Sequence, residues 1–301
     1  MWGKDVELTS GKGTSQTEHK IVSDNFGGVI LAWEERTIIN EESHVYIQRI
    51  DSLGNKLWGD KGILVVKTPG SQITPHIIPD LSGGAIVAWS DCRNDLTGAN
   101  WDIYMQRINS RGEPLWAADG VMISTDARDE FIGELLPGMD GGATIVWNMV
   151  VPGVAGTAQG FEFHFRKLNS EGSWNPTLMS SKFLSLPASE TNYELADDIF
   201  NDGENGFAIA LIAGKNHTDA KLHIQYVNPG GEMAFAYDGG LRIDTLGSDW
   251  EDIQLSTDSI GNFLLSWTQP SDSATLVTTH KIDINGSMTL VDSKIEPIDS
   301  F

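Results

Sequence analysis

The sequence has little cysteine, little positive charge and no long apolar run. Cys92 is its only cysteine, which excludes an intrachain disulfide and a cysteine-based metal cluster. No apolar segment approaches the roughly 18 residues that a membrane-spanning helix needs. Only 20 Lys and Arg residues stand against 42 Asp and Glu residues, so the formal net charge is −22. Such a surface repels phosphates and anionic headgroups, and we expect neither nucleic acid nor an inserted membrane as a partner.

Common catalytic signatures are missing as well. The sequence contains no recognisable Ser/His/Asp order, no phosphate-binding glycine loop and no "HExxH". Its start, "MWGKDVELTS", has no signal-peptide pattern and reads as the middle of a repeat. We therefore expect an excised, monomeric domain of a longer protein.

What the sequence has in quantity is self-similarity. "GGVILAWEERTIINEESHVYIQRIDSLGNKLW" begins at Gly27, and "GGAIVAWSDCRNDLTGANWDIYMQRINSRGEPLW" begins at Gly83. Five residues after the second position of each such glycine pair, or of its degenerate form, the sequence has Trp33, Trp89, Trp147, Leu211 and Trp267. Three residues after an Asp or Asn, a second marker recurs in the same register at Gly54, Gly112, Gly172, Gly231 and Gly286. Two markers in one register indicate five copies of one unit.

Each unit predicts four short antiparallel strands. "AIVAW" is typical of a buried strand, and "DIYMQRIN" alternates with a period of two, while Asp or Asn with Gly forms the turns. Five such units predict an all-β fold, a five-bladed β-propeller that forms a single domain over 1–301. The approximate blade ranges are 18–68, 74–125, 132–185, 196–245 and 252–298. The tryptophan at the end of each second strand should fill the gap between neighbouring blades.

Both ends of the chain resemble a fourth strand. Trp2 lies 25 residues before Gly27, as Trp58 lies 25 before Gly83. Residues 1–10 should therefore close the ring with the last blade and remove the exposed sheet edges. The C-terminal "SKIEPIDSF" also has the pattern of a fourth strand, and the choice between the two stays open.

The repeat resembles a family of repeats in bacterial secreted and cell-surface proteins, with a pattern close to "DGxGGAIVAWxDxRxGxxDIYxQRxxxxGxxLW". The second unit carries the resemblance most fully, through Asp80, Gly83, Gly84, Trp89, Asp91, Arg93, Trp101, Asp102, Ile103, Tyr104, Gln106, Arg107, Gly112 and Trp116. The third to fifth units keep the glycines but lose the "D-x-R" and "QR" elements. The resemblance implies a propeller-like, extracytoplasmic domain, secreted or on the cell surface, and implies no chemistry.

A set of polar residues is expected to meet at the mouth of the central channel. Four residues before the first turn of each unit the sequence has Lys20, His76, Glu134, Asp198 and Gln254. The simplest interpretation is a solvated channel. A second is a hard cation such as Ca²⁺, held by Glu134, Asp198, Asp197 and Asp252. A third is glycoside hydrolysis, with Glu134 and Asp198 as acid and base.

Other candidates lie in the variable loops, which should gather on one face and bind the ligand. Trp101, Trp250 and Tyr193 are interpreted either as loop anchors or as surfaces that stack on a sugar. Asp91 with Arg93, and Glu35 with Arg36, are expected to form local ion pairs. Gln48-Arg49, Gln106-Arg107 and Gln225 are expected to be interblade hydrogen-bonding groups.

The function that these features favour is a non-catalytic binding or scaffolding module of a secreted or surface bacterial protein. Its ligand would be a polysaccharide or a protein, bound through His76, Glu134, Asp198, Gln254 and the loop aromatics. The alternatives are a carbohydrate-active enzyme with carboxylates at the channel mouth, and a purely structural spacer.

Overall fold

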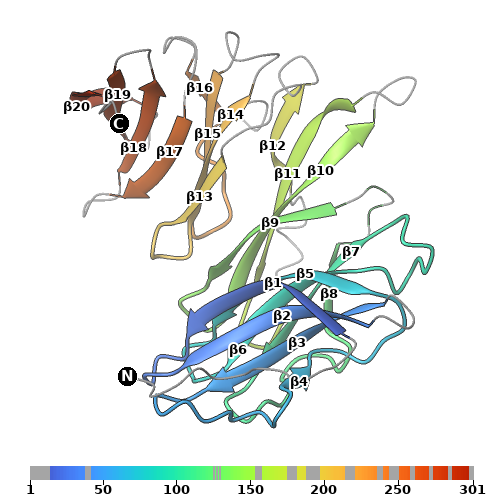
Figure 1. Cartoon of the computed structure of the whole chain (residues 1–301). Coiled ribbons are helices and arrows are strands. Elements are labelled where there is room, and N and C mark those ends of the chain that lie inside the picture. The colour runs from blue at the N-terminus through green and yellow to red at the C-terminus, as the bar shows by residue number, and fades with distance from the viewer. Residues whose placement is uncertain are drawn as a thin grey trace. The chain divides into compact units, whose positions relative to one another are not determined.

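The computed structural model describes most of the chain. The described residues are 14–37, 42–124, 126, 128, 130–152, 158–174, 182–187, 197–213, 221–235, 240–243, 251–257, 262–270, 274–283 and 287–297. Within them, twenty strands form five sheets, and each sheet has four antiparallel strands that are consecutive in the sequence (Figure 1). The prediction of an all-β fold with five four-stranded units is confirmed.

We call the sheets first to fifth in chain order. Their strands are β1 (Thr14–Ser23), β2 (Val29–Thr37), β3 (Ser43–Ile50) and β4 (Ile63–Leu64); β5 (Gln72–Pro79), β6 (Ala85–Asp91), β7 (Asp102–Ile108) and β8 (Val121–Ser124); β9 (Glu130–Pro137), β10 (Ala143–Pro152), β11 (Ala158–Leu168) and β12 (Lys182–Pro187); β13 (Asp197–Asn201), β14 (Phe207–Ala213), β15 (Lys221–Val227) and β16 (Leu241–Ile243); and β17 (Glu251–Thr257), β18 (Phe263–Pro270), β19 (Ala274–Ile282) and β20 (Met288–Pro297).

The fourth strand of the fifth sheet comes from the C-terminal end of the chain. β20 pairs with β19 from Met288 to Pro297. The alternative that "SKIEPIDSF" continues the last unit as its fourth strand is therefore correct for residues up to Pro297. The predicted closing strand, residues 1–10, lies outside the described residues.

The chain divides into two compact units. The first contains residues 1–149 and 165–179, and the second contains 150–164 and 180–301. The first and second sheets lie in the first unit, the fourth and fifth in the second, and the third sheet contributes strands to both. The predicted single domain over 1–301, with its blade ranges, stays a prediction. No helix in the described residues is long and apolar enough to cross a membrane.

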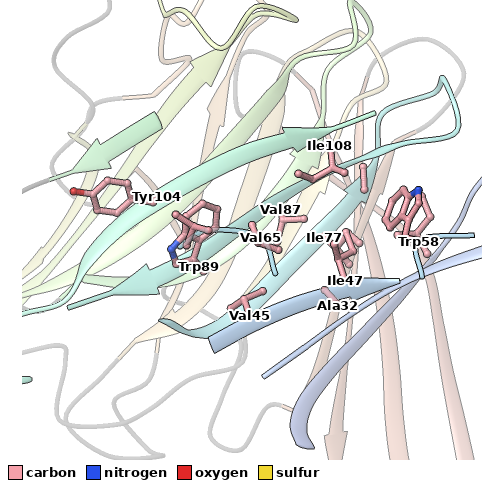
Figure 2. Close-up of a cluster of buried hydrophobic side chains, with 13 residues drawn as sticks. Ala32, Val45, Ile47, Trp58, Val65, Ile77, Val87, Trp89, Tyr104 and Ile108 are labelled. Atoms are coloured by element: carbon pink, nitrogen blue, oxygen red, sulfur yellow. The ribbon is translucent and has the colours of Figure 1, made fainter. Parts of the chain in front are cut away.

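The apolar core of the first unit lies between neighbouring sheets. Val45 and Ile47 of the first sheet pack with Ile77, Val87 and Trp89 of the second sheet in one buried cluster (Figure 2). A further cluster joins the second sheet to the third, and in the second unit a cluster joins the fourth sheet to the fifth. A sheet in the middle of such a series is covered on both faces, and all seven residues of β6 are buried.

Three of the four second-strand tryptophans lie inside these clusters. Trp89 packs between the first and second sheets, Trp147 between the second and third, and Trp267 between the fourth and fifth. The prediction that these rings fill the gaps between neighbouring units is confirmed.

A buried aspartate orders the first hairpin turn of the second sheet and binds an arginine. Oδ1 of Asp80 accepts hydrogen bonds from the N–H groups of Ser82 (2.8 Å) and Gly84 (2.7 Å), and Oδ2 lies 3.2 Å from Nη2 of Arg107. Asp24 and Arg49 repeat this arrangement in the first sheet, with 2.8 Å between Oδ2 and Nη2. The aspartate of the hairpin turn and the arginine of the "QR" motif are therefore joined in one ion pair.

The same arginine joins its sheet to the next one. Nη1 of Arg107 and Nε1 of Trp116 both donate to the main-chain carbonyl of Ser170, at 3.1 and 2.9 Å. Trp116 also lies against Gly172, where an added Cβ would sit 2.6 Å from Cγ of the indole. We call this contact the carbonyl clamp.

A second carbonyl clamp joins the first sheet to the second. Arg49 and Trp58 donate to the carbonyl of Ser110, at 3.4 and 3.1 Å, and Trp58 lies against Gly112. The arginines therefore act between sheets as predicted.

The glutamines of the "QR" motif act within their own sheet, so that part of the prediction is wrong. Oε1 of Gln106 accepts from the N–H groups of Arg107 and Trp116, and Nε2 donates to the carbonyl of Ala117. Gln48 and Gln225 bind the equivalent segments of their own sheets. The glutamine side chain therefore hydrogen-bonds main-chain groups of the fourth segment that have no partner in the regular strand pairing.

Arg107→Met should show how much the buried Asp80–Arg107 ion pair contributes to the free energy of unfolding. The substitution leaves the carboxylate of Asp80 buried without its cation, which costs about 3–5 kcal/mol of the free energy of unfolding. The matched control is Arg111→Met, because Arg111 pairs with Glu113 at the surface, where both side chains are more than half exposed. That change should cost little stability, because water screens the exposed pair. Urea denaturation checks both, and equal costs would contradict the role assigned to the Asp80–Arg107 pair.

Candidate functional site

A β-bulge interrupts the first strand of four sheets, and each bulge lies at the tryptophan of the neighbouring second strand. The bulges fall between Thr17 and Lys20 at Trp33, between Ile73 and His76 at Trp89, between Ile132 and Glu134 at Trp147, and between Glu251 and Gln254 at Trp267. In the fourth sheet the position of the tryptophan is taken by Leu211, and β13 pairs with β14 in unbroken register. A bulge bends its strand and redirects the side chains beside it.

Four of the five predicted channel-mouth residues follow these bulges directly. They are Lys20, His76, Glu134 and Gln254, whereas Asp198 lies in the regular strand β13. Lys20, His76 and Glu134 belong to the first unit, and Asp198 and Gln254 belong to the second. The equivalent register predicted from the sequence is correct within each unit.

A cavity of about 180 Å³ lies at the bulged ends of β1, β5 and β9 in the first unit. Its lining consists of Glu18, Lys20, Thr74, Pro75, His76, Ser90, Phe131 and Ile132. Two predicted residues, Lys20 and His76, therefore share one cavity. Glu134 lies on the same strand as Phe131 and Ile132 but is outside the lining, and its Oε1 accepts a hydrogen bond from the N–H of Leu135 at 3.1 Å.

Two residues of the cavity lining have a strained backbone. Glu18 has φ = 50° and Thr74 has φ = 49°, in the left-handed region that side chains other than glycine rarely adopt. Both lie in the bulges, at matching positions of neighbouring sheets. Thr74 is β-branched, which makes this conformation especially unfavourable, and its Oγ1 is held 3.2 Å from Oγ of Ser90 across the cavity wall.

His76 is the most perturbed titratable group of the cavity. Burial, together with the positive charge of Lys20, lowers the pKa of His76 to about 4. Among the described residues, neither ring nitrogen of His76 has a hydrogen-bond partner. At neutral pH the cavity therefore presents an uncharged imidazole with one N–H and one lone pair available to a ligand.

The remaining predicted carboxylates have other surroundings. Oδ2 of Asp198 accepts a hydrogen bond from the N–H of Leu255 at 2.6 Å, which ties β13 to β17. Since Glu134 and Asp198 belong to different units, their pairing as acid and base stays a prediction. The side chains of Asp197 and Asp252 lie outside the described residues. In the described part of the chain, no group of three or more His, Cys, Asp or Glu is arranged to hold a metal ion, and the Ca²⁺ site stays a prediction.

The loop aromatics are described only in part. Trp101 is half-buried, and its Nε1 donates to the carbonyl of Gly98 at 3.1 Å, as a loop anchor would. Trp250 and Tyr193 lie outside the described residues. At the root of the same loop, Oδ2 of Asp91 lies 2.5 Å from Nη2 of Arg93, so the predicted local ion pair is confirmed there. The Glu35–Arg36 pair stays a prediction.

A buried glutamate is the titratable group that the sequence analysis missed. Glu130, the first residue of β9, is 2% exposed, and its Oε1 accepts hydrogen bonds from Ser124 and from the N–H of Asp126. Its Oε2 is buried and has no partner among the described residues. Burial is the largest cause that raises the pKa of Glu130 to about 7, the charges of Asp102 and Asp126 contribute to the rise, and the hydrogen bonds from Ser124 and Asp126 oppose it. Glu130 is not part of the repeated pattern, so no sequence signal marked it.

Glu130 makes the stability of the chain depend on pH. Since the pKa is raised from its ordinary 4.5 to about 7, the folded state holds more protons than the unfolded state between these values. The free energy of unfolding should therefore fall as pH rises through this window. Glu130→Gln cannot ionise, so its stability relative to the unsubstituted chain should rise between pH 4.5 and about 7, by about 1.4 kcal/mol per pH unit, and level off above that. Urea denaturation at several pH values, with the exposed Glu113→Gln as the control, tests this; parallel pH profiles would contradict it.

No family model matches the sequence, and no curated protein matches it. Solved structures do resemble the chain. The endo-arabinase from Bacteroides thetaiotaomicron VPI-5482 has a TM-score of 0.43 and 13% identity, over 98% of this chain and 97% of that one. The endo-1,4-beta-xylanase from the same organism has a TM-score of 0.36 and 8% identity, over 93% and 94%. The mannose phosphorylase MPT-4 from Leishmania mexicana has a TM-score of 0.41 and 12% identity, over 99% and 89%.

These comparisons correct the main functional expectation. The sequence favoured a non-catalytic binding or scaffolding module, whereas the solved structures named above are all of enzymes that carry carbohydrate names. The expectation of a non-catalytic module is therefore wrong and is not retained.

Proposed function

We propose that the chain is a carbohydrate-active enzyme of the glycoside-hydrolase type, with its site in the cavity at the bulged ends of β1, β5 and β9. The observation that carries the proposal is the strained backbone of Glu18 and Thr74, which line this one cavity from matching positions of two sheets. Strain of this kind costs about 1–3 kcal/mol per residue and tends to persist at functional sites.

The cavity lining has both apolar and polar side chains, which can contact the C–H face and the hydroxyl groups of a sugar ring. Pro75, Ile132 and Phe131, which is 52% exposed, offer apolar surface to the C–H face of a pyranose or furanose. Lys20 and His76 offer polar groups to the hydroxyls. A mostly preformed site of this kind, with a few convergent polar groups, is typical of small-ligand recognition.

The neutral state of His76 matters for this recognition. Because its pKa is lowered to about 4, the imidazole is uncharged at neutral pH. Binding a sugar hydroxyl therefore does not require water to be removed from a charged ring. One ring nitrogen donates to a hydroxyl oxygen and the other accepts from a hydroxyl, so His76 orients the ring. Burial, aided by the cationic charge of Lys20, keeps the imidazole in this state.

We assign the two carboxyl groups of hydrolysis to Glu18 and Glu134. Glu18 lines the cavity, and Glu134 follows the bulge of β9 that brings Ile132 into the lining. One carboxyl group protonates the leaving oxygen while the other acts as base or nucleophile. Glu18 replaces Asp198 in this assignment because Asp198 belongs to the second unit and already binds the N–H of Leu255.

Release of reducing ends from a panel of neutral polysaccharides tests the proposal. Glu18→Gln and Glu134→Gln should each lower the rate by about 100-fold or more, since each removes an acid–base group. Glu113→Gln is the control, because Glu113 lies in an exposed turn and pairs only locally. No hydrolysis by the unsubstituted chain on any member of the panel, or full activity in both variants, would overturn the proposal.

We also propose that the five sheets close into one propeller ring, and that the chain belongs to a secreted or surface protein of bacteria, as its repeats resemble. The clusters shared by neighbouring sheets support the ring, and so does the exposure of Ile21 in β1 and of Leu290 and Ile295 in β20, which a ring could cover.

The ring predicts a compact particle in solution. A single compact domain of this length has a radius of gyration of about 19 Å. Small-angle X-ray scattering measures this value directly. A distinctly larger radius, with the two-peaked distance distribution of separate bodies, would contradict closure.

A further inference from the structure

The bulge in β5 contains two residues, Thr74 and Pro75, and His76 is the first residue after it. Proline suits this place because it has no N–H that the strand pairing could lose. Pro75 is buried, whereas Thr74 is exposed and lines the cavity together with His76. A bulge redirects the side chains beside it, so the backbone conformation of Thr74 directs the segment that carries the imidazole.

Two local preferences oppose the conformation of Thr74. Its φ of 49° lies in the left-handed region, which is unfavourable for a β-branched side chain. A residue that precedes proline also prefers an extended backbone, and Pro75 follows Thr74 directly. A conformation that the local sequence disfavours in two ways must be held by a contact from elsewhere in the fold.

The contact is a hydrogen bond to the neighbouring strand β6. Oγ1 of Thr74 donates to Oγ of Ser90 at 3.2 Å. Ser90 is 7% exposed, in a strand whose first five residues are apolar, and a buried hydroxyl without a partner is costly. The bond therefore satisfies Ser90 while it holds Thr74. At the matching positions the first sheet has Glu18 and Glu34, so the hydroxyl pair is not part of the repeat.

We propose that Ser90 is a positioning residue, which holds Thr74 in the left-handed conformation and thereby keeps the imidazole of His76 in the cavity. This role rests on the proposed function, in which His76 orients the sugar. Without the bond, Thr74 leaves the left-handed region and His76 loses part of its burial. Burial is the largest cause that lowers the pKa of His76, so the titration of the imidazole reports on its position.

The titration of His76 tests this role without any substrate. In the unsubstituted chain the imidazole ¹H–¹³C signal of His76, assigned by its loss in His76→Gln, should stay constant from about pH 5.5 to 8, because its pKa is about 4. Thr74→Val removes the donor but keeps the shape of the side chain, and Ser90→Ala removes the acceptor. In both variants the pKa should rise toward the ordinary 6.5, so that the signal moves within this range. A constant signal in either variant would overturn the proposal.

The direction of the change separates positioning from a simple change of the cavity wall. In a cavity that does not move, a methyl group in place of the hydroxyl of Ser90 makes the surroundings less polar and lowers the pKa of His76 further. Only displacement of the imidazole raises it. Thr74→Ser is the conservative variant, because it keeps the hydroxyl and removes the β-branch, and its His76 signal should stay constant.

A second hydroxyl pair supplies the matched control. Oγ of Ser266 lies 2.9 Å from Oγ1 of Thr279, between β18 and β19, where the two strands pair in unbroken register. Ser266→Ala should leave the titration of His76 unchanged. A rise of the pKa in this variant would mean that general loosening of the chain is sufficient, and would overturn the role of Ser90.

Glycine at position 74 should rescue the loss of Ser90. Because glycine adopts a positive φ without strain, the double variant Thr74→Gly/Ser90→Ala should again show a constant His76 signal. If the signal still titrates, Ser90 acts by a route other than Thr74 and the proposal is wrong.

In the hydrolysis assay, Ser90→Ala should raise KM several-fold and change kcat less, as expected when a binding group is misplaced. Absence of hydrolysis in the unsubstituted chain would overturn the proposed function, whereas the titrations alone decide whether Ser90 positions His76.

Discussion

A main-chain carbonyl in a hairpin turn, held by the arginine and the tryptophan of the preceding sheet, is the contact on which the first unit depends. A four-stranded sheet has two apolar faces and cannot cover either by itself, so the neighbouring sheets must cover them. The clamp fixes that neighbour in register. Its parts depend on one another, because Asp80 orders one turn and neutralises Arg107, Arg107 reaches Ser170, and Gly172 leaves room for the indole of Trp116.

The repeat also places a β-bulge beside the tryptophan of the second strand. The tryptophan that fills the gap between sheets lies at a bulge in the adjoining first strand, whereas the described residues of β13, beside Leu211, pair with β14 without a bulge. Packing at one end of the unit thus disturbs the ladder of the strand that leads to the cavity. The irregular part of the repeat holds His76, which is half-buried and lines the cavity.

Much of the architecture could be predicted from the sequence because glycine turns and buried tryptophans leave local marks. The number of units and the role of Trp89 are of this kind. The register that placed Lys20 and His76 together was also legible. The bulges could not be predicted, because the residues on both sides of a bulge have the same sequence pattern as those of a regular strand. Glu130 was missed because its pKa is raised by burial, which the repeated pattern does not mark, and Gln106 was misassigned because its partners lie in its own sheet.

The most direct measurement on the clamp is a double-mutant cycle between Trp116 and Gly172, read from the free energy of unfolding. If the indole occupies the space above Gly172, Gly172→Ala is costly in the presence of Trp116 and costs only about 1–2 kcal/mol of left-handed strain in a Trp116→Ala background. The two changes should then be strongly non-additive. Additive costs would mean that the tryptophan and the turn do not touch, and the basis for joining one sheet to the next would be lost.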